Sequence, residues 1–371
     1  MKLNIPMYEL KSMLTAAKTV AVKGKAIKES FACIMLTAED NTLFVKALNE
    51  ICGLKVFTNT VSIAEEGTAV VDAGMLCGIV DKYPANVNCS LDTTDTRLVI
   101  KCGKSKSQLA LMPSDIMTDP ADCVETSRVK MTGDALAKLF SQVSYAVGKN
   151  DSRSILKSVM LKFGMGRMTA VALDGFRLAL VEQNNSEIDG EEQKIIIPDT
   201  AVGTVISLAS AEKNNEVTVC AGNGRMALKG NSFELNSTLL SGEYIDYNRI
   251  INKDSKTIAQ APVKDLKEAL ERSMVVSGKE MIRMSLGADG IALTSNSKED
   301  IASIYEEIDA GVMGEDLNIA FNPVYLRDAL NAIPDDCPDF HLSTAVNPAY
   351  FSGDTADGSY VHLLLPVRIM S

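Results

Sequence analysis

Few residues in this chain have the types and spacing that catalysis requires. The chain contains only two histidines, His341 and His362, and both lie in segments that alternate like β-strands. Neither histidine occurs in a metal-binding pattern such as His-Glu-x-x-His, and the eight cysteines show no zinc-type spacing. Gly103-Lys104-Ser105 resembles the end of a phosphate-binding loop, but Leu98 stands where that loop requires a glycine. We therefore expect no metal site and no cofactor.

Carboxylates are numerous, so paired-acid chemistry is an alternative that the sequence leaves open. The pairs Glu65-Glu66, Glu191-Glu192 and Asp335-Asp336 lie in turn-like contexts that are typical of solvated loops. Asp174 has the best claim to a special role, because it ends a strand-like segment just before Arg177. Its carboxylate could pair with that arginine, or it could brace the Asp-Gly turn. One hypothesis is a carboxylate-based hydrolase centred on this pair. The lack of a nucleophile or a poised histidine favours a binding protein.

The composition is that of an ordinary globular protein. The 371 residues are 46% hydrophobic and 23% charged, which supplies ample core material. No apolar run reaches the roughly 18–20 residues that a bilayer span needs, and the N-terminal segment does not resemble a secretion signal. We therefore expect a cytoplasmic protein with reduced cysteines and no association with membranes.

The net charge of −11 argues at first against nucleic acid as a partner. The charge is unevenly distributed, however, because residues 255–371 carry 9 basic and 18 acidic side chains. A basic surface that faces one way within an acidic protein is therefore compatible with the sequence. The alternative is a generally acidic protein that binds no nucleic acid.

The elements that would position any site recur three times along the chain. Each third shows a helix pattern, an alternating strand that ends in a polar residue, and a second helix pattern. The first helices are predicted at Met7–Val22, Asp134–Val147 and Val263–Val276, the strand ends at Asn49, Asp174 and Asn296, and the second helices begin near Ala73, Asp199 and Pro323. The interval is the size of a small domain. We predict three similar α+β domains of antiparallel strands with two helices each, at residues 1–126, 127–254 and 255–371.

Four strings carry a family resemblance. They are VALDGFRLAL (Val171–Leu180), STLLSGEYIDYNRII (Ser237–Ile251), FNPVYLRDALNAI (Phe321–Ile333) and LLLPVRI (Leu363–Ile369). In order and spacing they resemble the bacterial DNA polymerase III beta subunit family of replicative sliding clamps. The resemblance implies a non-catalytic processivity factor of the DNA polymerase III holoenzyme. In such a factor a head-to-tail homodimer closes into a ring around duplex DNA, with helices inside and sheets outside.

The resemblance also implies a DNA-binding set. A ring that slides over any sequence needs weak contacts to phosphates rather than to bases. Lysines of the predicted inner helices, basic residues of the loop after the first helix and one polar residue match this role. The implied DNA-binding residues are Lys11, Lys18, Lys23, Lys25, Lys28, Lys138, Asn150 and Lys267.

A second implied site is a hydrophobic cleft between the second and third domains, in which DNA polymerases, the clamp loader and repair proteins place short hydrophobic peptides. The implied cleft residues are Leu156, Leu173, Gly175, Phe176, Arg177, Leu178, Ile245, Arg249, Ile250, Val346, Pro348, Leu363, Leu365, Pro366, Val367 and Arg368. The alternative is that Leu173, Leu178 and Leu365 are plain core residues. Leu173, Phe176 and Ile245 depart from the family pattern of threonine, histidine and proline, so we expect a more apolar cleft with a different peptide preference.

The implied dimer interface joins the first domain of one copy to the third domain of the other. It consists of Ser107, Leu109, Val275 and Val276. Ser107 stands where the family has an aromatic residue, which puts the strength of the interface in question.

Overall fold

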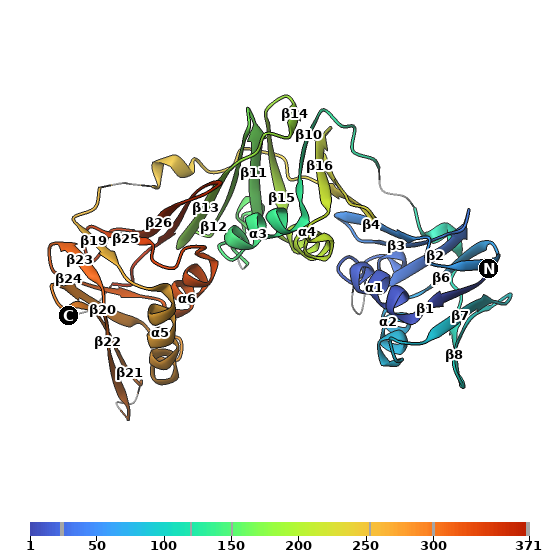
Figure 1. Ribbon diagram of the computed structural model, residues 1–371, viewed down its shortest axis with the longest axis horizontal. Coiled ribbons are helices and arrows are strands. Elements are labelled where there is room, and N and C mark those ends of the chain that lie inside the picture. Colours follow the sequence, from blue (N-terminus) through green and yellow to red (C-terminus); the bar gives the residue numbers. More distant parts are fainter. Residues whose placement is uncertain (23–25, 119–120, 150, 252–253, 299–300, 369–371) are drawn as a thin grey trace. The chain divides into compact units, whose positions relative to one another are not determined.

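The computed structural model describes residues 1–22, 26–118, 121–149, 151–251, 254–298 and 301–368 (Figure 1). The chain forms two compact units. The first contains residues 1–137, 187–193 and 200–239, and the second contains residues 138–186, 194–199 and 240–371. Within the described residues, no helix has the length and apolar character needed to cross a membrane. Both units combine helices with antiparallel sheets, which confirms the predicted α+β class.

The first unit contains two sheets in which neighbouring strands run antiparallel. The five-stranded sheet has the order β5 (Ser62–Glu65), β1 (Lys2–Pro6), β7 (Asn88–Thr93), β8 (Arg97–Cys102) and β9 (Ser105–Ala110). The nine-stranded sheet has the order β14 (Ile188–Gly190), β10 (Ser127–Thr132), β16 (Glu216–Gly222), β17 (Arg225–Lys229), β18 (Phe233–Thr238), β4 (Cys52–Thr58), β3 (Thr42–Leu48), β2 (Cys33–Glu39) and β6 (Gly67–Asp72).

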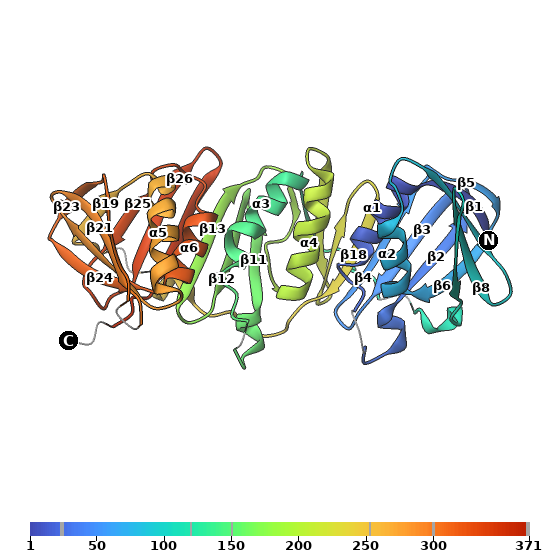
Figure 2. The same ribbon diagram turned by 90° about the horizontal axis from the view of Figure 1, so that it is seen from below.

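Helices cover one face of these sheets. In α1 (Met7–Ala17), Leu10, Leu14 and Ala17 form a buried stripe that packs on β3 and β4. The second helix, α2 (Ala73–Lys82), lies beside α1 (Figure 2). The unit also contains α4 (Asp199–Glu212), the start of α3 (Gly133–Ser144), and the 3₁₀ turns η1 (Glu29–Ala32) and η2 (Ser114–Ile116).

The second unit has a matching construction. Its nine-stranded sheet has the order β15 (Gln193–Pro198), β11 (Ser158–Gly164), β12 (Arg167–Leu173), β13 (Arg177–Asn184), β27 (Gly358–Leu364), β26 (Ala349–Thr355), β25 (Asp339–Leu342), β19 (Thr257–Gln260) and β23 (Gly311–Gly314). Its four-stranded sheet has the order β22 (Ser303–Ile308), β21 (Gly290–Asn296), β20 (Ile282–Gly287) and β24 (Leu317–Phe321). The unit also contains α5 (Val263–Ser277), α6 (Pro323–Ala332), η3 (Ser154–Lys157) and η4 (Tyr247–Arg249).

The predicted domains are joined through strands. In the first unit, β4 of the first repeat pairs with β18 of the second, and in the second unit β13 pairs with β27 of the third. The sheets therefore continue across the predicted boundaries, and compact units follow the sheets rather than the repeats. The boundaries at residues 126 and 254 stay a prediction.

The polar residue that ends each repeated strand closes a tight turn. Asn49 Oδ1 accepts hydrogen bonds from the N–H groups two and three residues ahead, both at 2.8 Å, and Asp174 Oδ1 does the same at 2.9 and 3.0 Å. In the third repeat, Ser297 Oγ accepts from the N–H groups of Ile301 and Ala302. Strand β21 ends at Asn296, as predicted, but the side chain that closes its turn is that of the next residue, Ser297.

Candidate functional site

An apolar floor lies where β13 meets β27. Leu156, Leu173, Leu178 and Leu363 are buried there in one hydrophobic cluster. Ile245 packs against this cluster from the connection that follows β18, as does Ile250. Leu173 and Leu178 are buried, so the alternative that they are core residues is correct. They can support a binding surface but are not themselves exposed to a ligand. We call this region the β13–β27 site.

Three apolar side chains of the site remain open to solvent. Phe176 is 58% exposed, Val346 is 63% exposed and Leu365 is 37% exposed. Leu365 N–H donates to the carbonyl oxygen of Phe176 over 2.8 Å, which fixes the two residues beside each other. Leu365 is thus not a core residue. Gly175, Arg249 and Arg368 are also exposed, whereas Pro348, Pro366 and Val367 are half-buried.

Arg177 holds this region together from the opposite side of the strand. Its Nε donates to Asp174 Oδ2 over 3.0 Å and its Nη1 donates to Asp328 Oδ2 over 2.7 Å. The guanidinium also lies 5.3 Å from the ring centroid of Tyr145 and 4.5 Å from that of Tyr325. Both alternatives for Asp174 are therefore correct, because it braces the turn at Gly175 (φ +88°) and pairs with Arg177. Both of its oxygens are engaged, which argues against a role as a nucleophile.

Both histidines pack against tyrosine side chains. His362 is buried with its Nδ1 2.9 Å from the hydroxyl of Tyr145, and burial lowers the pKa of His362 to about 3. His341 stacks on Tyr350 with ring centroids 4.5 Å apart and lies within hydrogen-bond distance of Ser352, and burial lowers its pKa too. Among the described residues, no cluster of three or more His, Cys, Asp or Glu side chains could hold a metal ion.

Some residues of the site went unrecognised in the sequence. Tyr325 and Asp328 of α6 contact Arg177. Both lie in the third string that carries the family resemblance, but neither was among the predicted site residues. Tyr145 follows α3 and has no recognisable signal of its own. Tyr244 and Tyr350 complete the apolar floor.

The predicted DNA-binding lysines lie on different elements. On α1, Lys11 Nζ donates to the backbone oxygen of Asp81 over 3.1 Å. Lys18, the residue that follows α1, forms an ion pair with the Asp81 carboxylate. Lys28 is exposed near η1, Lys138 is exposed on α3, and Lys267 is half-exposed on α5. Lys23, Lys25 and Asn150 lie outside the described residues.

The predicted dimer residues lie on one edge strand and one helix. On β9, Leu109 is buried, and Ser107 is half-buried with its Oγ 2.7 Å from the hydroxyl of Tyr83. On α5, Val275 is 85% exposed and Val276 is half-exposed.

The repeated domains, the strand junctions and the apolar site together define the DNA-clamp class. Models of the N-terminal, central and C-terminal domains of the DNA polymerase III beta subunit match residues 1–117, 130–246 and 248–368. The chain belongs to the DNA polymerase III beta subunit family, whose function is to act as a non-catalytic sliding clamp and processivity factor. The hydrolase hypothesis is therefore wrong.

Relatives and solved structures agree with this assignment. A protein named beta sliding clamp from Vibrio cholerae is 24% identical over 93% of this chain and 94% of its own length. Another from Streptomyces coelicolor is 26% identical over 91% of this chain and 92% of its own length. The crystal structure of DNA polymerase III beta subunit from Thermotoga maritima covers both chains fully with a TM-score of 0.90 at 24% identity. A sliding clamp from Pseudomonas aeruginosa bound to griselimycin also gives a TM-score of 0.90, at 22% identity and full coverage of both chains.

Proposed function

We propose that two copies of this chain close head to tail into a ring around duplex DNA in the cytoplasm. The α-helical lysines would then contact phosphates, and the β13–β27 site would hold DNA polymerases, the clamp loader and repair proteins by short hydrophobic peptides. Topology rather than affinity would keep the ring on DNA, because a closed ring cannot leave without opening.

Two open sheet edges give the strongest support for a ring of two chains. Strand β9 ends the five-stranded sheet and β22 ends the four-stranded sheet, and each has a neighbour on one side only among the described strands. In the repeats, β9 is the counterpart of β18 and β27, while β22 is the counterpart of β4 and β13. Those counterparts pair with each other at both junctions. The same pairing between β9 of one copy and β22 of another would close a ring from two chains.

The register of this contact follows from the two junctions. Cys52 lies opposite Ser237 in the first unit, as Arg177 lies opposite Leu364 in the second. The equivalent positions in the open edges are Ala302 on the β22 side and Leu109 on β9. Counting outward along antiparallel strands then places Ile304 opposite Ser107, Tyr305 opposite Lys106, and Glu307 opposite Lys104.

The side chains of the two edges complement each other in this register. Lys106 on β9 and Lys104 just before it make this edge basic, whereas Glu307 is an exposed carboxylate on β22. The neighbouring Glu306 is already bound by Arg272. Tyr305 is 62% exposed, so its ring is available to a lysine of a second copy. On the helix side, the half-buried Ile304 would occupy the space that the small Ser107 leaves. A hydrophobic contact would thus replace the aromatic residue that the family has at the serine position.

Removing Lys11 and Lys18 tests the DNA-binding face. We expect Lys11→Ala with Lys18→Ala to flatten the log–log salt dependence of DNA binding, by a slope of roughly 0.9 for each phosphate that is no longer neutralised. Fluorescence anisotropy with a labelled duplex at several salt concentrations measures this slope. The matched control is Lys55→Ala with Lys229→Ala, which removes two exposed lysines from strands β4 and β17. A slope equal to that of the unmodified protein would remove Lys11 and Lys18 from the DNA face.

A carboxylate in the β13–β27 site tests partner binding. We expect the unmodified protein to bind griselimycin, and Leu365→Asp to weaken that binding roughly 30- to 100-fold, because an apolar side chain is replaced by a charge that must be desolvated. Isothermal titration calorimetry gives both affinities. The control is Met313→Asp, at a methionine of β23 that is 71% exposed. Equal affinity of the Leu365 variant and the control would contradict the assignment of the site.

A further inference from the structure

The β4–β18 junction of the first unit repeats the construction of the β13–β27 site. Thr238 N–H donates to the carbonyl oxygen of Ile51 over 3.0 Å, just as Leu365 N–H donates to that of Phe176. Ile51 therefore occupies the position of the exposed phenylalanine, and Thr238 that of the exposed leucine.

This junction contains a cavity with an apolar floor. The cavity has a volume of about 280 Å³, and Phe31 and Leu48 are buried at its base in one hydrophobic cluster. Ile51 is half-buried in its wall, and Ile27 is 87% exposed at its edge. The cavity is large enough for one aliphatic side chain of a ligand.

Positive charge borders the cavity. Lys28 and Arg225 both line it, and the Lys28 Nζ lies 5.7 Å from the ring centroid of Phe31. Within the described part of the chain, neither cation has an ion-pair partner. Glu50 is the one acidic residue of the lining, so the cations are in excess. A ligand with a carboxylate next to its apolar group would complement this border.

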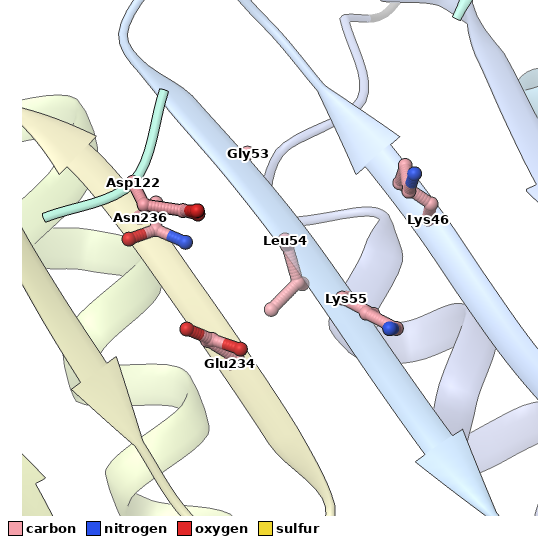
Figure 3. Close-up of a pocket in the computed structure, with 7 residues that line it drawn as sticks. All are labelled: Lys46, Gly53, Leu54, Lys55, Asp122, Glu234 and Asn236. Atoms are coloured by element: carbon pink, nitrogen blue, oxygen red, sulfur yellow. The ribbon is translucent and has the colours of Figure 1, made fainter. Parts of the chain in front are cut away.

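A second hollow of about 270 Å³ lies further along the same two strands (Figure 3). Gly53 of β4 pairs with Asn236 of β18 there, and the missing side chain of the glycine leaves room. Asn236 is only 8% exposed, and its Oδ1 has no hydrogen-bond partner among the described residues. A buried acceptor of this kind favours a ligand that brings an N–H donor.

The two hollows lie on one face of the sheet. Ile51, just before β4, and Gly53 are two residues apart, as are Thr238 and Asn236 on β18, so these positions face the same side of the sheet. Two residues of extended chain span roughly 6.6 Å. A peptide of four or five extended residues would therefore reach both hollows.

We propose that the β4–β18 junction is a second peptide-binding groove, which takes an extended peptide with an aliphatic residue next to an acidic one. The aliphatic side chain enters the cavity over Phe31 and Leu48, the carboxylate meets Lys28 and Arg225, and a main-chain N–H reaches Asn236. This groove would differ from the β13–β27 site in its apolar contacts, because Ile51 and Thr238 stand in place of Phe176 and Leu365.

Fluorescence anisotropy of the full-length protein with a labelled Leu-Asp-Leu-Asp-Leu peptide tests this groove. We expect saturable binding that Arg225→Glu weakens at least tenfold. Ile27→Asp should weaken it in the same direction, and it cannot disturb the core because Ile27 is almost fully exposed. Lys213→Glu is the matched charge reversal at an exposed lysine outside the groove and should have no effect. Leu365→Asp should also have no effect, which separates this groove from the β13–β27 site.

Each contrary result would overturn the proposal. Absence of binding, or equal binding of a Leu-Lys-Leu-Lys-Leu peptide, would show that the groove does not select an acidic ligand. Loss of binding in the Leu365 variant alone would place the peptide at the β13–β27 site. If Arg225→Glu weakens duplex DNA binding and leaves peptide binding intact, Lys28 and Arg225 bind DNA phosphates and not a peptide carboxylate.

Discussion

An aspartate in place of Ile304 is expected to turn the dimer into monomers. Ile304 is half-buried within one protomer, so the variant can fold, but the proposed register places its side chain inside the closed edge. An unpaired carboxylate buried there costs roughly 3 kcal/mol at each of the two interfaces of a ring, which weakens the dimer on the order of ten-thousand-fold. Size-exclusion chromatography with light scattering at micromolar concentration should give 39.9 kDa for the variant and twice that mass for the unmodified protein.

The proposed pairing of β22 with β9 places Ile304 opposite Ser107, so a second substitution can test this one contact. Adding Ser107→Lys to the Ile304 variant should restore the dimer, because the new lysine would face the new aspartate across the edge. Met313→Asp, at an exposed position on β23, should leave the mass unchanged. A dimeric Ile304→Asp variant, or a rescue by Gln108→Lys rather than by Ser107→Lys, would refute the proposed pairing.

Arg177→Met is expected to destabilise the second unit strongly. The arginine is 9% exposed and neutralises Asp174 and Asp328, so its removal leaves two carboxylates without their common partner. Removing one partner of a buried ion pair costs about 3–5 kcal/mol. The loss should appear in urea denaturation as an earlier transition of this unit.

The control for this variant is Arg153→Met. Arg153 also pairs with an aspartate, Asp151, but its side chain is 63% exposed, and exposed ion pairs contribute little to stability. Similar midpoints for the two variants would mean that the Arg177 network does not stabilise the unit. The result also bears on function, because the network lies behind the turn that presents Phe176.

Local signals in the sequence predicted the second helix of each repeat well. The predicted starts at Ala73 and Pro323 are those of α2 and α6, because the preceding residue caps each helix. Asp72 accepts from the N–H of Met75, and Asn322 accepts from that of Val324. A cap depends only on residues a few positions apart, so a single sequence contains the whole signal.

The first helix was predicted too long for a reason that the sequence alone hides. The apolar pattern continues beyond Ala17 through Val20 and Val22, but α1 ends at Ala17. Val22 N–H instead donates to the carbonyl oxygen of Phe31, and that hydrogen bond takes the chain out of the helix. In the third repeat the side chain that closes the turn comes one residue after the strand, at Ser297, and the connection from Ser297 to Ala302 is longer than its counterparts.

Most of the residues that meet where β13 pairs with β27 belong to the strings that carry the family resemblance. The sequence did not divide them into the buried floor and the exposed Phe176, Val346 and Leu365, because burial depends on strands brought together from different repeats. The link from Arg177 to Asp328 joins residues far apart in the chain, and no local pattern indicates such a pair.

Retention on circular and linear DNA tests the encircling mechanism most directly. The protein would be loaded by its clamp loader onto a nicked circular plasmid and separated from free protein at a salt concentration that removes ordinary electrostatic binding. The proposed ring should stay on the circle and be released when a restriction enzyme linearises it. Equal retention on the circular and the cut plasmid would contradict the ring.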